Sequence, residues 1–391
     1  MTTISIPMLA DRHSHPLLYS AFISGVDLSA VREKAVAISK LREAADGHSN
    51  ASLLVAYGWK DNFFRLEPKD LEPLPPVAVF NLSLHWLVTN SSAKTILREH
   101  YGDDVDHVED TDWYEAHFRV VLNWFAKLGG SAQSLVRFFD FLETLGVWSC
   151  EELLLVDGQE IEWFQETDLI SRTRFWSDLN VFSGLNDEQR KHVHGSKLFT
   201  DGALGARTAA IGTAYLHSDS SGVLLYKDEE LIEAYDACQE NSPRLAVHAI
   251  GDRAIEQTLR CLEQDDRYRN FDELRIEHAQ LISLEQARRA KNMGICLSMQ
   301  PNFNVDSTNY EDRLPSTLCR ANNPFRMLID EIGFVPGDDL IFGSDGMPHG
   351  AQEAADQSFQ PPLESQRLSI DEFRAGYCSR ESRAPEFEIS L

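Results

Sequence analysis

Two histidines one residue apart, His13 and His15, stand near the start of this chain in the segment DRHSH. Four further candidates for the same site lie far downstream, each at or just beyond the end of a short β-like run: Lys197, His248, His278 and Asp345. A catalytic zinc ion binds imidazole nitrogen and carboxylate oxygen and keeps one position open for water. The pattern therefore predicts a metal site that activates water for hydrolysis.

Ligands so far apart in the chain need a fold that gathers the ends of separate strands. Short apolar runs alternate with helical patterns, which is typical of βα units and a parallel sheet. Eight candidate strands can be read from the sequence: Ile4–Leu9, Val147–Val156, Thr173–Asp178, Ser196–Phe199, Arg244–Ala249, Leu274–His278, Gly294–Met299 and Leu340–Gly343. They predict an α/β fold of the (β/α)8 or TIM-barrel type, in which functional side chains lie at the C-terminal strand ends.

Residues two apart on a strand point to the same face, so His13 and His15 can reach one ion. A lone histidine beside a strand is more often a structural residue, but here every candidate ends an independently predicted strand. His192 and His194 form a second pair that precedes the strand at Ser196–Phe199. We expect this second pair at the opposite end of the barrel, without a metal role.

Lys197 needs a change of chemistry before it can bind a metal, because an ammonium group only donates hydrogen bonds. Burial and nearby positive charge lower the pKa of a lysine, and the neutral amine can then take up CO₂. The resulting carbamate is an anionic ligand with two oxygens. We predict an N6-carboxylated Lys197 that bridges two ions; an unmodified lysine beside one ion is the alternative.

The residues in excess of a barrel of about 250 residues lie mostly between the first and second strands, from about Leu17 to Gly146. This stretch holds two helical patterns and two β-like runs: Ala30–Ala45, Trp113–Leu128, Ser52–Tyr57 and Val77–Leu82. We predict one barrel domain over residues 1–391 with a cap or subdomain inserted over the barrel mouth. A separate N-terminal α+β domain is the alternative.

Composition limits the partners. The 391 residues include 36 basic and 62 acidic side chains, a net charge of −26, which disfavours nucleic acid and anionic membranes. Six scattered cysteines fit reduced thiols, and neither a signal-peptide pattern nor a membrane-length apolar run occurs. We expect a cytoplasmic protein with a small-molecule substrate and leave a homodimer open.

Several segments resemble the amidohydrolase superfamily, specifically its YtcJ-like branch (amidohydrolase family 3). The motifs that carry the resemblance are KLFTDGALGARTA from Lys197, VHAIGDRA from Val247, RIEHAQ from Arg275, SMQP from Ser298 and GSD from Gly343. In the expected insertion, Tyr57–Trp59 and the stretch from Val79 to Asn90, which includes His85, resemble the segment that lines the pocket in this family.

The resemblance implies a metal-dependent hydrolase on a distorted barrel. The positions that match the metal site of the family are His13, His15, Lys197, His248, His278 and Asp345. One or two divalent ions are implied, with Zn²⁺ as the first candidate. The branch usually carries a flanking β-sandwich, but the short segment before His13 and a tail rich in Ser, Glu and Pro predict that this layer is absent or truncated.

The ligands suggest the mechanism. Asp345 is the predicted general base, because it is both a ligand and a neighbour of the attacking water. His85 and Arg207 are predicted donors to the carbonyl oxygen of the substrate. We predict hydrolysis of a C–N bond in an amide or N-substituted formamide. A deaminase, an esterase or lactonase, and a non-catalytic regulatory protein are the alternatives.

Overall fold

The computed structural model describes residues 2–23, 25–46, 53–82, 84 and 86–391. The chain forms two compact units, one made of Met1–Pro16 with Phe138–Leu391 and the other of Leu17–Arg137. The second unit ends nine residues before the expected Gly146, because the last part of helix α6 (Ala132–Thr144) packs on the first unit. There the ring of Phe139 contacts the ring of Phe164 at 5.9 Å between centroids.

The first unit contains an eight-stranded parallel sheet that nearly closes into a barrel. Its strands, in spatial order, are β2 Leu9–Ser14, β7 Val147–Glu152, β8 Thr173–Ser177, β9 Val193–Phe199, β10 Arg244–Ala249, β11 Glu273–His278, β12 Cys296–Met299 and β13 Leu340–Phe342. This is the α/β TIM-barrel class that the alternating sequence pattern predicts.

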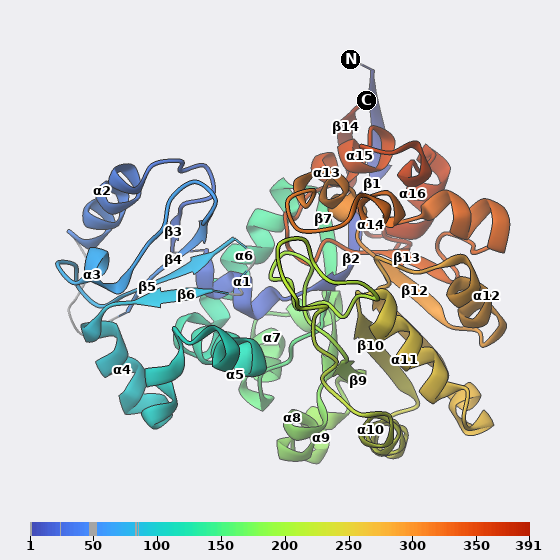
Figure 1. The fold of residues 1–391 in the computed structure, drawn as a ribbon, viewed down its shortest axis with the longest axis horizontal. Coiled ribbons are helices and arrows are strands. Elements are labelled where there is room, and N and C mark those ends of the chain that lie inside the picture. Colours follow the sequence, from blue (N-terminus) through green and yellow to red (C-terminus); the bar gives the residue numbers. More distant parts are fainter. Residues whose placement is uncertain (1, 24, 47–52, 83, 85) are drawn as a thin grey trace. The chain divides into compact units, whose positions relative to one another are not determined.

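Helices connect successive strands (Figure 1). They are α7 Gly158–Glu166, η2 Leu169–Arg172, α8 Leu179–Gly184, α9 Asp187–Arg190, α10 Asp228–Asn241, α11 Asp252–Leu262, η3 Asp266–Asn270, α12 Leu284–Asn292, η4 Pro301–Val305, α13 Asp306–Asn309, α14 Ser316–Ala321, η5 Met327–Ile332, α15 Ala351–Phe359, η6 Glu364–Gln366 and α16 Ile370–Tyr377. Helix α11 buries Ile255, Leu259 and Leu262, which recur at helical spacing. Such apolar stripes hold the helices against the sheet.

The first barrel strand differs from the expected Ile4–Leu9. That apolar run splits at Met8: β1 (Thr3–Pro7) leaves the barrel, and the barrel strand is β2, Leu9–Ser14. Hydrophobicity misplaces this strand because its last four residues, DRHS, are polar yet largely buried. The histidine pair consequently lies at the end of a strand, as the metal-site prediction requires.

The C-terminal tail also differs from expectation. Strand β14 (Glu386–Ser390) pairs antiparallel with β1, with Thr3 opposite Ser390, so the two ends of the chain lie side by side (Figure 1). Its sequence EFEIS alternates polar and apolar residues, which is the pattern of a half-buried strand. The tail therefore contains a return strand that its Ser, Glu and Pro content concealed.

Side chains bridge the seam between β13 and β2. The backbone N–H of Asp345 donates to the carbonyl oxygen of His13 at 2.7 Å, and the backbone N–H and the hydroxyl of Ser344 both donate to the carboxylate of Asp11. Glycine is needed at position 343, because a Cβ there would collide with the backbone nitrogen of His13. The GSD segment thereby places Asp345 beside the histidine pair.

The second unit has a four-stranded sheet of β3 Val26–Asp27, β4 Leu54–Trp59, β5 Val77–Asn81 and β6 Leu87–Thr89. Its helices are α1 Pro16–Phe22, α2 Lys34–Ala45, α3 Pro68–Leu71, α4 Ser91–Tyr101, η1 Gly102–His107 and α5 Thr111–Gly129, followed by the start of α6. A core that includes Leu41, Trp59 and Val79 is fully buried within this unit. In the described part of the chain, no helix is long and apolar enough to cross a membrane.

Candidate metal centre

Three side chains from separate strand ends meet at the C-terminal end of the barrel. His13 lies on β2, His278 ends β11, and Asp345 follows β13. One potential ligand atom from each lies within 4.8 Å of the other two. Two imidazoles and one carboxylate at this spacing are a donor set that suits a divalent metal ion such as zinc.

His15 belongs to the same cluster. Its Nε2 lies 3.0 Å from Oδ1 of Asp345, and Nε2 of His13 lies 3.7 Å from the same oxygen. The two histidines therefore converge on Asp345, as their spacing on one strand predicts. The rings of His13 and His15 are perpendicular, with centroids 5.5 Å apart.

Buried carboxylates lie behind both histidines of this pair. Nδ1 of His13 lies 2.6 Å from Glu277, and Nδ1 of His15 lies 3.5 Å from Glu152. Such a partner fixes the tautomer and turns Nε2 toward the metal. Glu277 is fully buried and is balanced by the fully buried guanidinium of Arg275 at 2.7 Å.

The other two histidines are oriented in complementary ways. Nδ1 of His278 lies 2.8 Å from the Gln300 side-chain oxygen, which leaves Nε2 as the potential ligand atom. Nε2 of His248 lies 3.1 Å from the Gly202 carbonyl oxygen and 3.4 Å from Asp201, which leaves Nδ1. Their ring centroids are 4.5 Å apart, so His248 adjoins the cluster. The residues present fit a metal ion, because each imidazole keeps one nitrogen available.

Lys197 lies on β9 and is only 1% exposed. Its positive charge contributes to lowering the pKa of both His13 and His278, so the ammonium is close to the cluster. Nζ also lies 4.8 Å from the centroid of the Phe199 ring. Burial of the amine is one part of the environment that the carbamate prediction requires.

Burial and neighbouring charges set the protonation of the cluster. Burial lowers the pKa of His13 and, more strongly, of His278, so both imidazoles stay neutral. Burial would raise the pKa of Asp345, but the interactions with His13 and His15 outweigh it and hold that pKa well below its usual range. Burial also lowers the pKa of His15, yet contacts with Asp345 and Glu152 raise it to about 9. Neutral imidazole and ionised carboxylate are the forms that bind metals, so His13, His278 and Asp345 are in a metal-binding form, whereas His15 must first lose its proton.

Two members of the cluster adopt left-handed backbone conformations, which are costly for residues with a side chain. The φ angles are +70° at His278 and +55° at Asp345. Strain of this kind persists only where the surrounding structure enforces it, and it concentrates at functional sites. The turn at His278 also ends the alternation of β11, so that His278 and the preceding Glu277 both serve the same site.

The remaining candidates have different positions. Arg207 follows β9 in an exposed turn with φ of +62°. His85 lies outside the described residues. His194 lies near the start of β9 and bonds Glu273, while His192 bonds Gln165, so this pair is remote from the C-terminal strand ends.

Sequence reasoning missed the residues that orient the ligands, namely Glu277, Arg275, Glu152 and Gln300. Two of them stand in the RIEH motif, one and three positions before His278. The available signal was an Arg and a Glu inside an otherwise apolar strand, where unpaired charges are expensive to bury. Their partners come from other strands, which the linear sequence does not reveal.

The arrangement agrees with a comparison of the whole sequence. A model of the amidohydrolase family matches residues 90–353, more than half of the chain. This chain belongs to the amidohydrolase family. Within this family it resembles YtcJ of Bacillus subtilis (strain 168), named as an amidohydrolase, at 26% identity over 343 residues.

A second relative is LONG AFTER FAR-RED 3 of Arabidopsis thaliana, at 24% identity over 354 residues. These alignments cover 77% and 78% of this amidohydrolase but only 63% and 59% of the two relatives. The chain thus spans less than two thirds of the length of the curated relatives it matches.

Solved structures show the same fold. An uncharacterized metal-dependent hydrolase from Pyrococcus furiosus superposes with a TM-score of 0.71 at 21% identity, covering 99% of this chain and 87% of that one. A similar hydrolase from Pyrococcus horikoshii OT3 gives 0.71 at 21% identity, covering 96% and 77%. The likeness confirms the α/β barrel fold of this amidohydrolase.

Proposed function

We propose that this amidohydrolase is a divalent-metal-dependent hydrolase that cleaves a C–N bond in a small amide or N-substituted formamide. The observation that carries the proposal is the meeting of His13, His278 and Asp345, whose ligand atoms lie within 4.8 Å of one another. His15 and His248 complete the set of imidazoles around them. Zn²⁺ is the first candidate, since imidazole and carboxylate ligands suit it.

A divalent ion held by these residues supplies Lewis-acid chemistry, because it acidifies water and polarises a carbonyl oxygen. His13 and His278 hold their places because Glu277 and Gln300 bind their other ring nitrogens. Asp345 is ionised and reaches the histidine pair, so its carboxylate is placed to accept a proton from water.

The proposed reaction balances as a simple hydrolysis. The water oxygen forms a bond to the carbonyl carbon, and Asp345 takes one proton from that water. The C–N bond then breaks, and Asp345 passes its proton to the leaving nitrogen, giving a carboxylic acid and an amine. Arg207 is the proposed donor that steadies the carbonyl oxygen.

We further propose that Lys197 acts as its carbamate and bridges two ions. The neutral amine adds to CO₂ and releases one proton, which gives an anionic two-oxygen ligand. The burial of Lys197 and its closeness to His13 and His278 support this step. An unmodified lysine beside one ion is the alternative, and counting ions per chain separates the two.

Lys197→Ala tests the carbamate. It should lower both metal content and turnover, and a short carboxylic acid such as acetate should restore part of each by supplying the missing oxygens. One ion per chain in fully active wild-type protein, with no effect of acetate on the variant, would favour the unmodified lysine.

The function itself is tested by metal analysis of untagged protein followed by a panel of amides, N-substituted formamides, esters, lactones and amino-heterocycles. Metal-dependent turnover of an amide or formamide supports the proposal. Selective turnover of esters or lactones, or release of ammonia from heterocycles, would place the enzyme in one of those classes instead. Full activity in metal-free protein would overturn the metal mechanism.

A further inference from the structure

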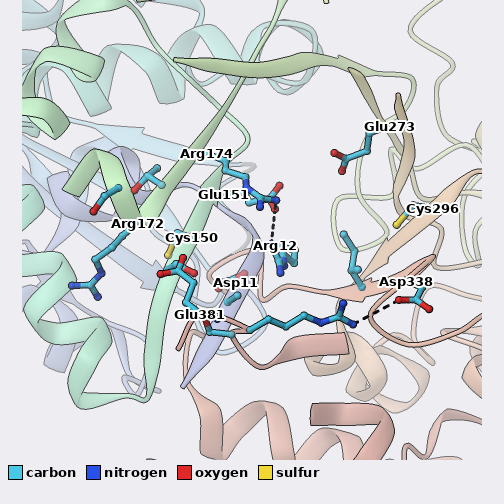
Figure 2. Close-up of a pocket in the computed structure, with 17 residues that line it drawn as sticks. Asp11, Arg12, Cys150, Glu151, Arg172, Arg174, Glu273, Cys296, Asp338 and Glu381 are labelled. Carbon is cyan, nitrogen blue, oxygen red and sulfur yellow. Dashed lines mark hydrogen bonds and ion pairs between the residues drawn. The ribbon is translucent and has the colours of Figure 1, made fainter. Parts of the chain in front are cut away.

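A cavity of about 510 Å³ lies within the barrel unit, away from the metal cluster. Residues at or near the starts of β8, β11 and β12 line it, among them Arg174, Glu273 and Cys296. Because parallel strands all start at one end of a barrel, this cavity belongs to the end opposite Asp345. Figure 2 shows Arg12, Arg174 and Glu151 together inside it.

Glu151 is the carboxylate that binds Arg12 and Arg174, two of the arginines of this cavity. Its Oε2 accepts from buried Arg275 at 2.6 Å and from the Trp176 indole at 2.8 Å. Its other oxygen, Oε1, is shared by Arg12 at 3.3 Å and Arg174 at 3.4 Å. Charge-assisted hydrogen bonds are usually about 2.7–2.9 Å long, so Glu151 binds Arg275 tightly and the two cavity arginines only weakly.

Arg12 and Arg174 therefore have spare donor capacity. A guanidinium group has five N–H donors, and among the described residues each of these two donates one hydrogen bond, to the same oxygen. Their side chains are 23% and 53% exposed. They come from β2 and β8, on either side of β7, so their guanidinium groups flank Glu151.

The other carboxylates that line the cavity have cationic or hydrogen-bonding partners of their own. Glu273 pairs with His194 at 2.9 Å, Glu381 with Arg383 at 2.7 Å, and Asp338 with Arg380 at 3.8 Å. Asp11 is bound by Ser344. In the described part of the chain none of these carboxylates forms a hydrogen bond or ion pair with Arg12 or Arg174, but the charge of Arg174 contributes, after the bond to Arg383, to lowering the pKa of Glu381.

The thiols and Arg172, which also line the cavity, do not neutralise Arg12 or Arg174. Burial raises the pKa of the Cys150 and Cys296 thiols, so neither adds a negative charge. Arg172 binds Glu143 and the Trp148 carbonyl oxygen, and Figure 2 shows it directed away from the other arginines. Arg12 and Arg174 therefore keep unmet donors on either side of Glu151. Arg380 is a further guanidinium in the lining, which donates to the Gly337 carbonyl oxygen and lies 3.8 Å from Asp338.

We propose that this cavity binds a small oxyanion, a carboxylate or phosphate group, between Arg12 and Arg174. Planar guanidinium forks match both kinds of oxyanion through paired N–H bonds. The anion accepts hydrogen bonds from the N–H groups of Arg12 and Arg174 that Glu151 leaves without an acceptor. This site takes no part in the reaction proposed at the metal centre, although Arg275 links Glu151 to Glu277, which lies behind His13.

The test is calorimetric titration of the metal-loaded protein with sodium phosphate and with sodium succinate, against NaCl of matched ionic strength. We expect saturable binding of at least one anion. The anion that binds more tightly identifies the chemical class of the ligand, phosphate or carboxylate. Arg174→Gln should weaken binding by about 10- to 100-fold, since hydrogen bonds to charged groups carry that much affinity. Oxyanions also bind metal ions, so the decisive quantity is the binding lost in Arg174→Gln.

Two further variants complete the design. Arg190→Gln removes an arginine of helix α9 that pairs with Asp187 outside the cavity, and it should bind like wild type. Arg174→Lys keeps the charge but loses the planar fork, so it should bind with intermediate affinity. Unfolding midpoints in NaCl verify that each variant is folded.

Three results would overturn the proposal. One is the absence of saturable binding beyond the NaCl control. Another is equal binding by wild type, Arg174→Gln and Arg174→Lys. The third is tighter binding of a diamine such as putrescine than of either anion, because the carboxylates would then be the ligand-binding groups.

Discussion

The His13 and His278 imidazoles of the cluster are oriented by the buried side chains that contact their Nδ1 atoms. His13 and His278 are each held at Nδ1 by a buried side chain, Glu277 and Gln300. A carboxylate behind an imidazole also raises its basicity as a ligand, whereas an amide contributes orientation alone. The negative charge of Glu277 is tolerated in the barrel interior because Arg275 balances it.

Asp345→Asn should separate metal binding from turnover. The amide retains an oxygen ligand but cannot accept the proton of water, and a positioned base contributes about 10²–10⁴-fold to the rate. We expect metal content near that of wild type and a turnover number reduced within that range. Metal analysis and steady-state kinetics check both, and a variant within a few-fold of wild type would mean that another residue is the base.

Glu277→Gln should weaken metal binding by about 10- to 100-fold, the usual cost of losing a carboxylate behind a ligating histidine. Competition with a chromophoric chelator measures the affinity directly. Glu273→Gln is the matched control, because Glu273 begins the same strand and bonds His194 instead. Equal metal affinities in the two variants would contradict the orienting role of Glu277.

At the scale of elements, the strands that sequence reasoning located best are the apolar ones. Arg244–Ala249 was predicted with its observed bounds. The barrel strand at Leu9–Ser14 was misplaced, because its last four residues, which are polar, are largely buried by partners from other strands. The return strand Glu386–Ser390 was missed because its pairing with Thr3–Pro7 depends on residues at the other end of the chain.

The candidate ligand positions could be proposed from sequence because each lies at or near the C-terminal end of a strand, and parallel strands bring these ends together. The orienting contacts could not, since Glu277 reaches His13 across 264 residues of sequence. Left-handed backbone at His278 and Asp345 is likewise enforced by the folded structure rather than by residue type. Strand periodicity therefore identifies the site but not its supporting contacts.

The charged network that links β7 to β11 makes stability depend on pH. Burial alone would raise the pKa of Glu151, but the charges of Arg275, Arg12 and Arg174 lower it from 4.5 to about 2. A carboxyl group whose pKa is lowered by folding stabilises the fold at pH values above its ordinary pKa. This stabilisation is lost as the pH falls toward the pKa of the group in the folded state. The shift corresponds to about 3 kcal/mol at neutral pH.

Glu151→Gln should remove this acid dependence. Between about pH 5 and pH 3, the free energy of unfolding of wild type should fall more steeply than that of the variant. At neutral pH the variant should be less stable by about 3–5 kcal/mol, since buried Arg275 loses a partner. Urea unfolding at several pH values measures both effects, and parallel pH profiles would show that Glu151 is not the group responsible.

At the scale of the whole molecule, all the described metal-site residues belong to one unit. His13 and His15 lie in Met1–Pro16, and Lys197, His248, His278 and Asp345 lie in Phe138–Leu391. The unit of Leu17–Arg137 has its own sheet and its own buried core. A metal held by these residues would therefore link the first barrel strand to strands more than 180 residues later within a single unit.

Removing the metal should consequently lower the stability of the barrel unit and leave that of the Leu17–Arg137 unit unchanged. A ligand present at about 1,000 times its Kd stabilises the folded state by about 4 kcal/mol, and chelation withdraws that contribution. In hydrogen exchange we expect β2, β10 and β11 to lose protection when a chelator is added, while β4 and β5 keep theirs. His278→Ala, which removes a ligand, should show the lower protection already and should not respond to the chelator. Equal loss of protection in β4 and β5 would show that the two units unfold as one, and an unchanged β11 would show that the metal does not stabilise the barrel.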